Sequence, residues 1–142
     1  MIGFLCAAVM WLFAQYLPGP IVKHSALTSL ALIIAGLGVI IEGLSVSSFV
    51  RAKTTVNPLQ PQRANKLVIS GMNRFSRNPM YLGMLLLLTA WAIFLGYPVG
   101  VMPVVGFVNY ITTFQIKPEE AALENVFGDE YLAYKSKVRR WI

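Results

Sequence analysis

The stretch "ALTSLALIIAGLGVIIEGLSVSSFV", from Ala26 to Val50, contains a single charged residue, Glu42. A helix that crosses a bilayer needs about 20 mainly apolar residues. We therefore predict a long transmembrane helix over about residues 25–50. Small residues at multiples of four along this helix predict a face for close helix packing, and they are Ala31, Ala35, Gly43 and Ser47.

Three other apolar segments accompany this one, at about Ile2–Leu17, Pro79–Leu95 and Val99–Ile116. Hydrophobic residues make up 56% of the 142-residue chain and charged residues only 13%, whereas a soluble domain carries about 25% charged residues. Lipid is therefore expected to cover much of the surface. We predict an all-α integral membrane helical bundle of about four transmembrane helices with a cytoplasmic amphipathic C-terminal helical tail.

Basic residues gather between the second and third apolar segments and again after the fourth. They are Arg51, Lys53, Arg63, Lys66, Arg74 and Arg77, then Lys117, Lys135, Lys137, Arg139 and Arg140. The positive-inside rule places both regions in the cytoplasm, and four spans put both termini on that side. Because the net charge of +6 sits beside apolar segments, it favours membrane lipids as partners over nucleic acid.

The chain is expected to form one domain over residues 1–142. Its parts are two N-terminal transmembrane helices (1–50), a cytoplasmic basic loop (51–78), a transmembrane hairpin (79–116) and a cytoplasmic tail (117–142). Apolar residues at helical spacing predict an amphipathic helix in the tail, and they are Leu123, Val126 and Phe127. Gly128 is expected to end this helix, and "DEYLAYKSKV" to form a second short one.

Glu42 is the first residue that could carry chemistry. A charged residue near the centre of a membrane costs at least roughly 2.5–3.5 kcal/mol, so an acid there has a functional role by default. A protonated or locally paired Glu42 that only fixes helix packing is an equally good interpretation. The residue also suits a small multidrug-type cation/proton transporter.

Glu119 and Glu120 follow Pro118 directly. Proline at a first helical position with acids in the first turn is an ordinary helix start, and the local sequence favours that interpretation. Two adjacent carboxylates at a membrane mouth would also attract a cationic small molecule.

The border stretch "NRFSRNPMYLG", from Asn73 to Gly83, raises the same choice. Asn78 can cap a helix that begins at Pro79, and arginines with Tyr81 can act as interface anchors. The same groups suit a carboxylate or phosphate. Because the predicted topology brings this border and the paired acids to one membrane face, the two together would match a zwitterion.

The chain has one cysteine, Cys6, and one histidine, His24. We therefore expect no metal site and no histidine-based catalytic triad. Methyl transfer from a sulfonium donor suits this inventory, because the donor is already activated and the protein has mainly to align the reactants and exclude water.

Three stretches resemble the isoprenylcysteine carboxyl methyltransferase and phospholipid methyltransferase group of integral-membrane enzymes, most closely its short bacterial members. They are "TTVNP" (Thr54–Pro58), "LVISGMNRFSRNPMYLG" (Leu67–Gly83) and "IKPEEAALENVFGDEYLAYKSKVRRW" (Ile116–Trp141). With the intervening hairpin they cover nearly two thirds of the chain. Each stretch alone is a weak signal, but their order and spacing together are specific.

The resemblance implies S-adenosylmethionine as cofactor, S-adenosylhomocysteine as product, and a bacterial inner membrane as location. The cofactor-binding residues that it implies are Arg77, Asn78, Pro79, Tyr81, Leu82, Gly83, Glu119, Glu120, Tyr131 and Tyr134. Both acids would face the cofactor's amino group, while the two later tyrosines would close over its adenosine. For catalysis we assign Arg77 and Tyr81, which would place the cofactor, and Glu42, which would line the acceptor side.

The chain departs from the family pattern in two places. Larger members have His at the position of Asn78, and many have Arg where this chain has Thr112, Thr113 and Ala121. Carboxylate binding would then rest on Arg74 or Arg77. The acceptor could present a carboxylate, an amine or a thiol on a lipid-like molecule. A transporter that uses Glu42 and a non-catalytic membrane protein with the same fold are the alternatives.

Overall fold

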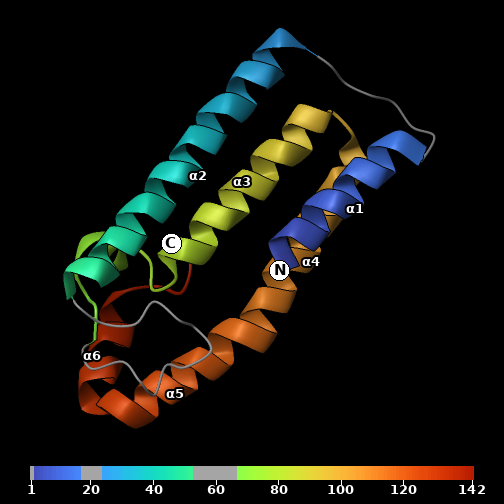
Figure 1. The fold of residues 1–142 in the computed structure, drawn as a ribbon. Helices are drawn as coiled ribbons and strands as arrows, with labels where there is room; N and C mark the ends of the chain where they lie inside the picture. The colour runs from blue at the N-terminus through green and yellow to red at the C-terminus, as the bar shows by residue number, and fades with distance from the viewer. Residues whose placement is uncertain (1, 17–23, 53–66) are drawn as a thin grey trace. The chain divides into compact units, whose positions relative to one another are not determined.

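The computed structural model describes residues 2–16, 24–52 and 67–142, and every regular element in these ranges is helical (Figure 1). The α-helices are α1 (Ile2–Tyr16), α2 (Ser25–Ala52), α3 (Pro79–Leu95), α4 (Val101–Ile111), α5 (Lys117–Phe127) and α6 (Asp129–Lys137). Between them lie the 3-10 turns η2 (Gly71–Arg74) and η3 (Pro98–Gly100) and the π-helical turn η4 (Thr112–Ile116). The all-α prediction is confirmed for these residues.

Two helices in the described ranges are long and apolar enough to cross a membrane, Ser25–Arg51 with 27 residues and Pro98–Phe127 with 30. Helices α1 and α3 are apolar but shorter, with 15 and 17 residues. A span usually needs about 17–25 residues, so α1 lies just below this range and α3 at its lower limit. Two candidate spans are therefore shown, rather than the four that we predicted.

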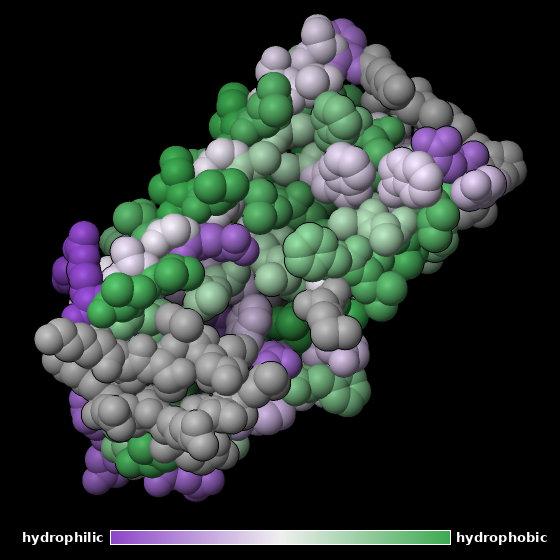
Figure 2. All heavy atoms as spheres, viewed as in Figure 1, coloured by the Kyte–Doolittle hydropathy of each residue, from purple (hydrophilic) through white to green (hydrophobic). Residues whose placement is uncertain are grey.

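Large apolar side chains face outward on both N-terminal helices. Phe4 of α1 is 86% exposed and Leu32 of α2 is 66% exposed, and Figure 2 shows apolar residues over much of the visible surface. Soluble monomers rarely leave such continuous apolar surface in water. A lipid environment would account for it.

The described residues fall into two compact units. The first takes those within Met1–Ile40 and Gly83–Tyr110, and the second those within Ile41–Leu82 and Ile111–Ile142.

Close backbone approach holds the first unit together. A Cβ atom added to Gly38 of α2 would lie 3.0 Å from the carbonyl oxygen of Gly83 and 3.1 Å from the Leu87 side chain, both in α3. Helix α1 contacts α3 as well, because the Trp91 indole N–H donates to the carbonyl oxygen of Ala7 at 3.1 Å. The turn η3 packs against α1.

The predicted packing row on α2 is partly wrong. Ala31, Gly38 and Ser45 are buried, whereas Gly43 is exposed and has no neighbour within 4 Å of an added Cβ atom. A helix has 3.6 residues per turn, so positions seven apart remain on one face while a four-residue repeat drifts around the axis.

In the second unit, α5 is not a separate helix with its own start. Its α-helical hydrogen bonding resumes at Lys117, directly after the predicted segment end at Ile116. The helix Pro98–Phe127 is nevertheless continuous through this point, so Pro118 does not begin a separate helix. The backbone N–H of Lys117 donates to the carbonyl oxygen of Thr112, five residues earlier. Proline lacks an N–H and its ring clashes with the preceding turn of an α-helix, and the wider π-helical turn accommodates it.

Gly128 ends α5 and precedes α6, as predicted, and its φ of +51° suits glycine. Tyr131 and Tyr134 of α6 form a buried cluster with Leu67. Leu123 and Phe127 pack against this cluster as the predicted stripe requires, together with Val138, whereas Val126 is exposed. The predicted loop residues Lys53, Arg63 and Lys66 and the stretch Thr54–Pro58 lie outside the described residues.

Candidate functional site

Buried polar side chains are concentrated in the second unit. Across the described ranges all of them lie there, and they are Ser45, Asn73, Ser76, Asn78 and Glu120. Burying a polar group costs free energy unless it is hydrogen-bonded, and burying a charge costs more unless it is paired. Folding of the second unit therefore includes a free-energy cost of burying polar groups that purely apolar packing would not have.

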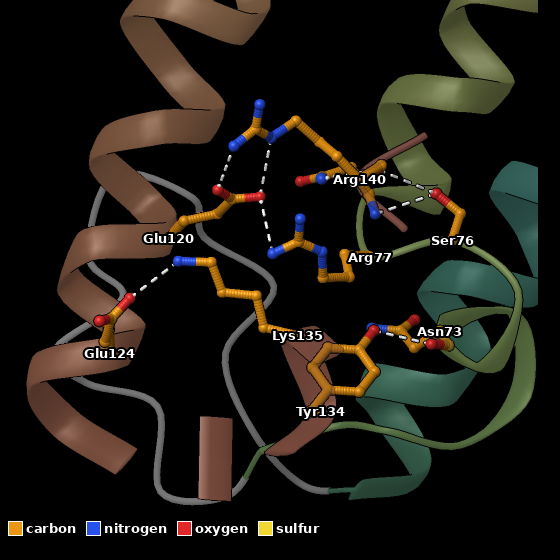
Figure 3. Close-up of polar contacts among 9 residues, drawn as sticks. Asn73, Ser76, Arg77, Glu120, Glu124, Tyr134, Lys135 and Arg140 are labelled. Atoms are coloured by element: carbon orange, nitrogen blue, oxygen red, sulfur yellow. Dashed lines mark hydrogen bonds and ion pairs between the residues drawn. The ribbon is translucent and has the colours of Figure 1, made fainter. Parts of the chain in front are cut away.

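Glu120 of α5 faces the guanidinium groups of Arg77 and Arg140 (Figure 3). Arg140 donates to both of its carboxylate oxygens, from Nε at 3.0 Å and from Nη2 at 2.7 Å. Nη1 of Arg77 lies 3.2 Å from Glu120 Oε1. The two-pronged contact is the strong form of the arginine–carboxylate pair, and it raises the pKa of Arg140 above its ordinary value.

Glu119, the neighbouring acid, has a different environment. Its Oε2 accepts a hydrogen bond of 3.3 Å from the Tyr81 hydroxyl, and no ion pair to it occurs within the part of the chain that the structure describes. The two predicted acids therefore have different partners. Glu120 is engaged by two guanidinium groups, while Glu119 is oriented by one phenol.

The Arg77 guanidinium is buried and incompletely satisfied. Its side chain is 9% exposed, and neither Nε nor Nη1 has a hydrogen-bond acceptor among the described residues, the ion pair with Glu120 notwithstanding. Buried donors without an acceptor are unusual in folded proteins. Such a guanidinium can receive a carboxylate or phosphate oxygen.

Asn78 contacts both α3 and the C-terminal residues, and its backbone carbonyl accepts a hydrogen bond of 3.0 Å from the Leu82 N–H of α3. Its side-chain Nδ2 donates to the carbonyl oxygen of Arg140 at 3.0 Å, and the Ser76 hydroxyl donates to the same oxygen at 3.4 Å. The backbone N–H of Arg77 donates to the carbonyl oxygen of Arg139 at 3.0 Å. The segment before α3 and the C-terminal residues are therefore tied together.

The two α6 tyrosines are neutral phenols with raised pKa values. The Tyr134 hydroxyl donates to the carbonyl oxygen of Asn73 at 2.7 Å. Burial raises the pKa of Tyr131 to about 12, with the Glu120 carboxylate adding to the shift and Arg77 opposing it. Burial also raises the pKa of Tyr134, so both phenols keep their protons at neutral pH.

The remaining predicted residues are more dispersed. Pro79 and Leu82 are buried at the start of α3, whereas Gly83 belongs to the first unit, where its carbonyl faces Gly38. Glu42 of α2 is half-buried and forms no hydrogen bond or ion pair with the other described residues. Arg74 is exposed.

Sequence reasoning missed Arg140. The sequence predicts for Arg140 only a positive charge of the cytoplasmic tail, because the residue lies 20 positions beyond Glu120 and no spacing rule connects the two.

A model of the phospholipid methyltransferase family matches residues 26–130. The chain is also similar to an uncharacterized protein of Haemophilus influenzae, with 51% identity over 63 residues, which is 44% of this chain and 100% of that protein. No solved structure matches this chain.

Proposed function

Since the chain belongs to the phospholipid methyltransferase family, we propose that it transfers a methyl group from S-adenosylmethionine to an amphiphilic, lipid-like acceptor at the cytoplasmic membrane face. S-adenosylhomocysteine would be the product. The cofactor, when bound, supplies a methyl group already activated on a sulfonium.

The buried Arg77 guanidinium with unsatisfied donors carries the proposal. An amino-acid head group has a carboxylate that those donors would bind and an ammonium that Glu119 would bind, with Tyr81 holding the Glu119 carboxylate in place. Glu120 would contribute to binding indirectly, because its ion pair with Arg77 positions that guanidinium. These charges match a zwitterion better than a simple cation or anion.

Further residues complete the proposed pocket. Tyr131 and Tyr134 would cover the adenosine, and the backbone of Asn78, Pro79 and Leu82 would line the cofactor from the α3 side. Glu42 would line the acceptor side. Alignment of the acceptor and exclusion of water are the main tasks of these groups.

We also propose the membrane arrangement. The chain would form one domain with four spans, in which α1 and α3 join the two longer candidates, and both termini would be cytoplasmic. The placement of the basic residues supports this orientation. A bacterial inner membrane is the proposed location.

The test supplies the detergent-purified protein with S-adenosylmethionine labelled in its methyl group and a bacterial lipid extract. Label should appear in the lipid phase. Glu119→Gln should lower the rate roughly 10-fold or more, because a charge-assisted hydrogen bond is worth about 1.5–3 kcal/mol. The matched control is Glu130→Gln, which removes the same charge from an exposed residue of α6 and should leave the rate unchanged.

Two results would decide against the proposal. Binding of the cofactor without label transfer to any lipid or small amphiphile would favour a non-catalytic protein of the same fold. Proton-coupled uptake of a lipophilic cation, lost in Glu42→Gln, would favour the transporter.

A further inference from the structure

Arg140 is fastened at two points to the elements that carry the proposed site. Its backbone carbonyl accepts hydrogen bonds from Asn78 and Ser76, which precede α3. Its guanidinium holds Glu120 of α5 through hydrogen bonds of 3.0 and 2.7 Å. One residue near the chain end therefore joins the start of α3 to α5 (Figure 3).

The charges around Glu120 are unequal. The side chains of Glu120 and Arg77 are 8% and 9% exposed, and that of Arg140 is 33% exposed. Two guanidinium groups share one buried carboxylate, which leaves one positive charge in excess. Because Arg140 engages both oxygens of Glu120, Arg77 retains donors that no acceptor in the described residues satisfies.

We infer that Arg140 is a positioning residue, which saturates Glu120 and thereby keeps the Arg77 guanidinium open to the carboxylate of a ligand's amino-acid head group. The inference deepens the proposed function and rests on it. Without the Arg140 side chain, Arg77 would pair fully with Glu120 and its free donors would be lost. Recognition of the head group would weaken, while contacts to the nucleoside part of the ligand would remain.

Two ligands distinguish the binding of the amino-acid head group from the binding of the nucleoside part. S-adenosylhomocysteine has an amino-acid head group, whereas 5′-methylthioadenosine has the same thioether-linked adenosine without it. Calorimetric titration of the detergent-purified full chain would measure both affinities. For Arg140→Ala we expect the affinity for S-adenosylhomocysteine to fall roughly 10- to 100-fold and that for 5′-methylthioadenosine to stay unchanged.

Two further variants make the test specific. The affinity of Arg140→Lys for S-adenosylhomocysteine should lie between those of wild type and Arg140→Ala, because lysine keeps the charge but cannot form the two-pronged contact. Arg140→Lys also serves as the test variant if Arg140→Ala does not fold. Lys137→Ala removes an exposed positive charge from the same tail and should bind as wild type does.

An equal loss of affinity for both ligands, or no loss for either, would overturn the inference. If the wild-type protein binds neither ligand, the proposed function falls, and the cofactor role of Arg140 falls with it. The contact itself is tested without ligand, through the thermal midpoints of Arg140→Ala, Glu120→Gln and the double variant. Additive effects would contradict the contact, and strongly non-additive effects would support it.

Discussion

Different kinds of contact stabilise the inside of each compact unit. In the first, α2 and α3 approach so closely at Gly38 that an added Cβ atom would meet the Gly83 carbonyl at 3.0 Å. In the second, buried charges and hydrogen bonds connect residues about 60 positions apart, such as Tyr134 with Asn73 and Asn78 with Arg140. Close packing at small residues is typical of helices that associate in membranes. Buried polar groups lower the stability of the fold. In the second unit they lie in the region where the proposed polar ligand would bind.

The largest expected effect is loss of the carboxylate that two guanidinium groups share. Glu120→Ala would leave the buried Arg77 without its counter-charge, and breaking a buried pair in this way costs about 3–5 kcal/mol. Unfolding of the purified protein in a denaturing detergent would measure the change in free energy. Glu124→Ala is the matched control, because it breaks an exposed pair with Lys135 that is worth less than about 1 kcal/mol. Equal effects of the two variants would contradict the central place of Glu120.

A smaller effect is expected in the first unit from Gly38→Ala. The added methyl carbon would lie 3.0 Å from the Gly83 carbonyl oxygen and 3.1 Å from the Leu87 side chain, closer than ordinary van der Waals contact. Overpacking costs about 1–3 kcal/mol where the neighbouring backbone cannot shift. Gly36→Ala introduces the same methyl group one half-turn away, where no atom lies within 4 Å, and should not destabilise the protein. The same unfolding assay compares them. A stable Gly38→Ala variant would show that the two helices do not approach closely there.

The smallest of the three effects is expected from Tyr134→Phe. It removes the hydroxyl that donates to the Asn73 carbonyl at 2.7 Å and keeps the buried ring, so the cost should be about 1–2 kcal/mol. Tyr16→Phe alters an exposed ring of α1 and should change little. A loss for Tyr134→Phe no greater than for Tyr16→Phe would remove this hydrogen bond from the description of the second unit.

The sequence predicted most of the helices because their ends carry strong local signals. The Asn-Pro pair at Asn78 marks the start of α3, and the structure begins α3 at Pro79 and ends it at Leu95, as predicted. Gly128 separates α5 from α6 for the same local reason. The helix that runs through Pro118 was not predicted, because a proline after a polar residue resembles a helix start unless the preceding π-helical turn is known.

The polar contacts were less accessible to sequence reasoning. The paired acids were expected to act alike, but Glu119 faces Tyr81 while Glu120 faces Arg77 and Arg140. Neighbouring residues on a helix point in directions about 100° apart, so their partners depend on the packing of other elements. For the same reason, the role of Arg140 follows from its position against α5 and not from its place in the chain.

Hydrogen exchange followed by mass spectrometry, with and without S-adenosylhomocysteine, tests most directly whether the second unit binds a cofactor. Ligand at millimolar concentration should slow exchange in peptides from residues 73–82 and 117–141. Peptides from residues 2–16 and 24–40 should exchange at the same rate with and without ligand. Unchanged exchange throughout a folded protein, or protection confined to the first unit, would contradict the proposed site.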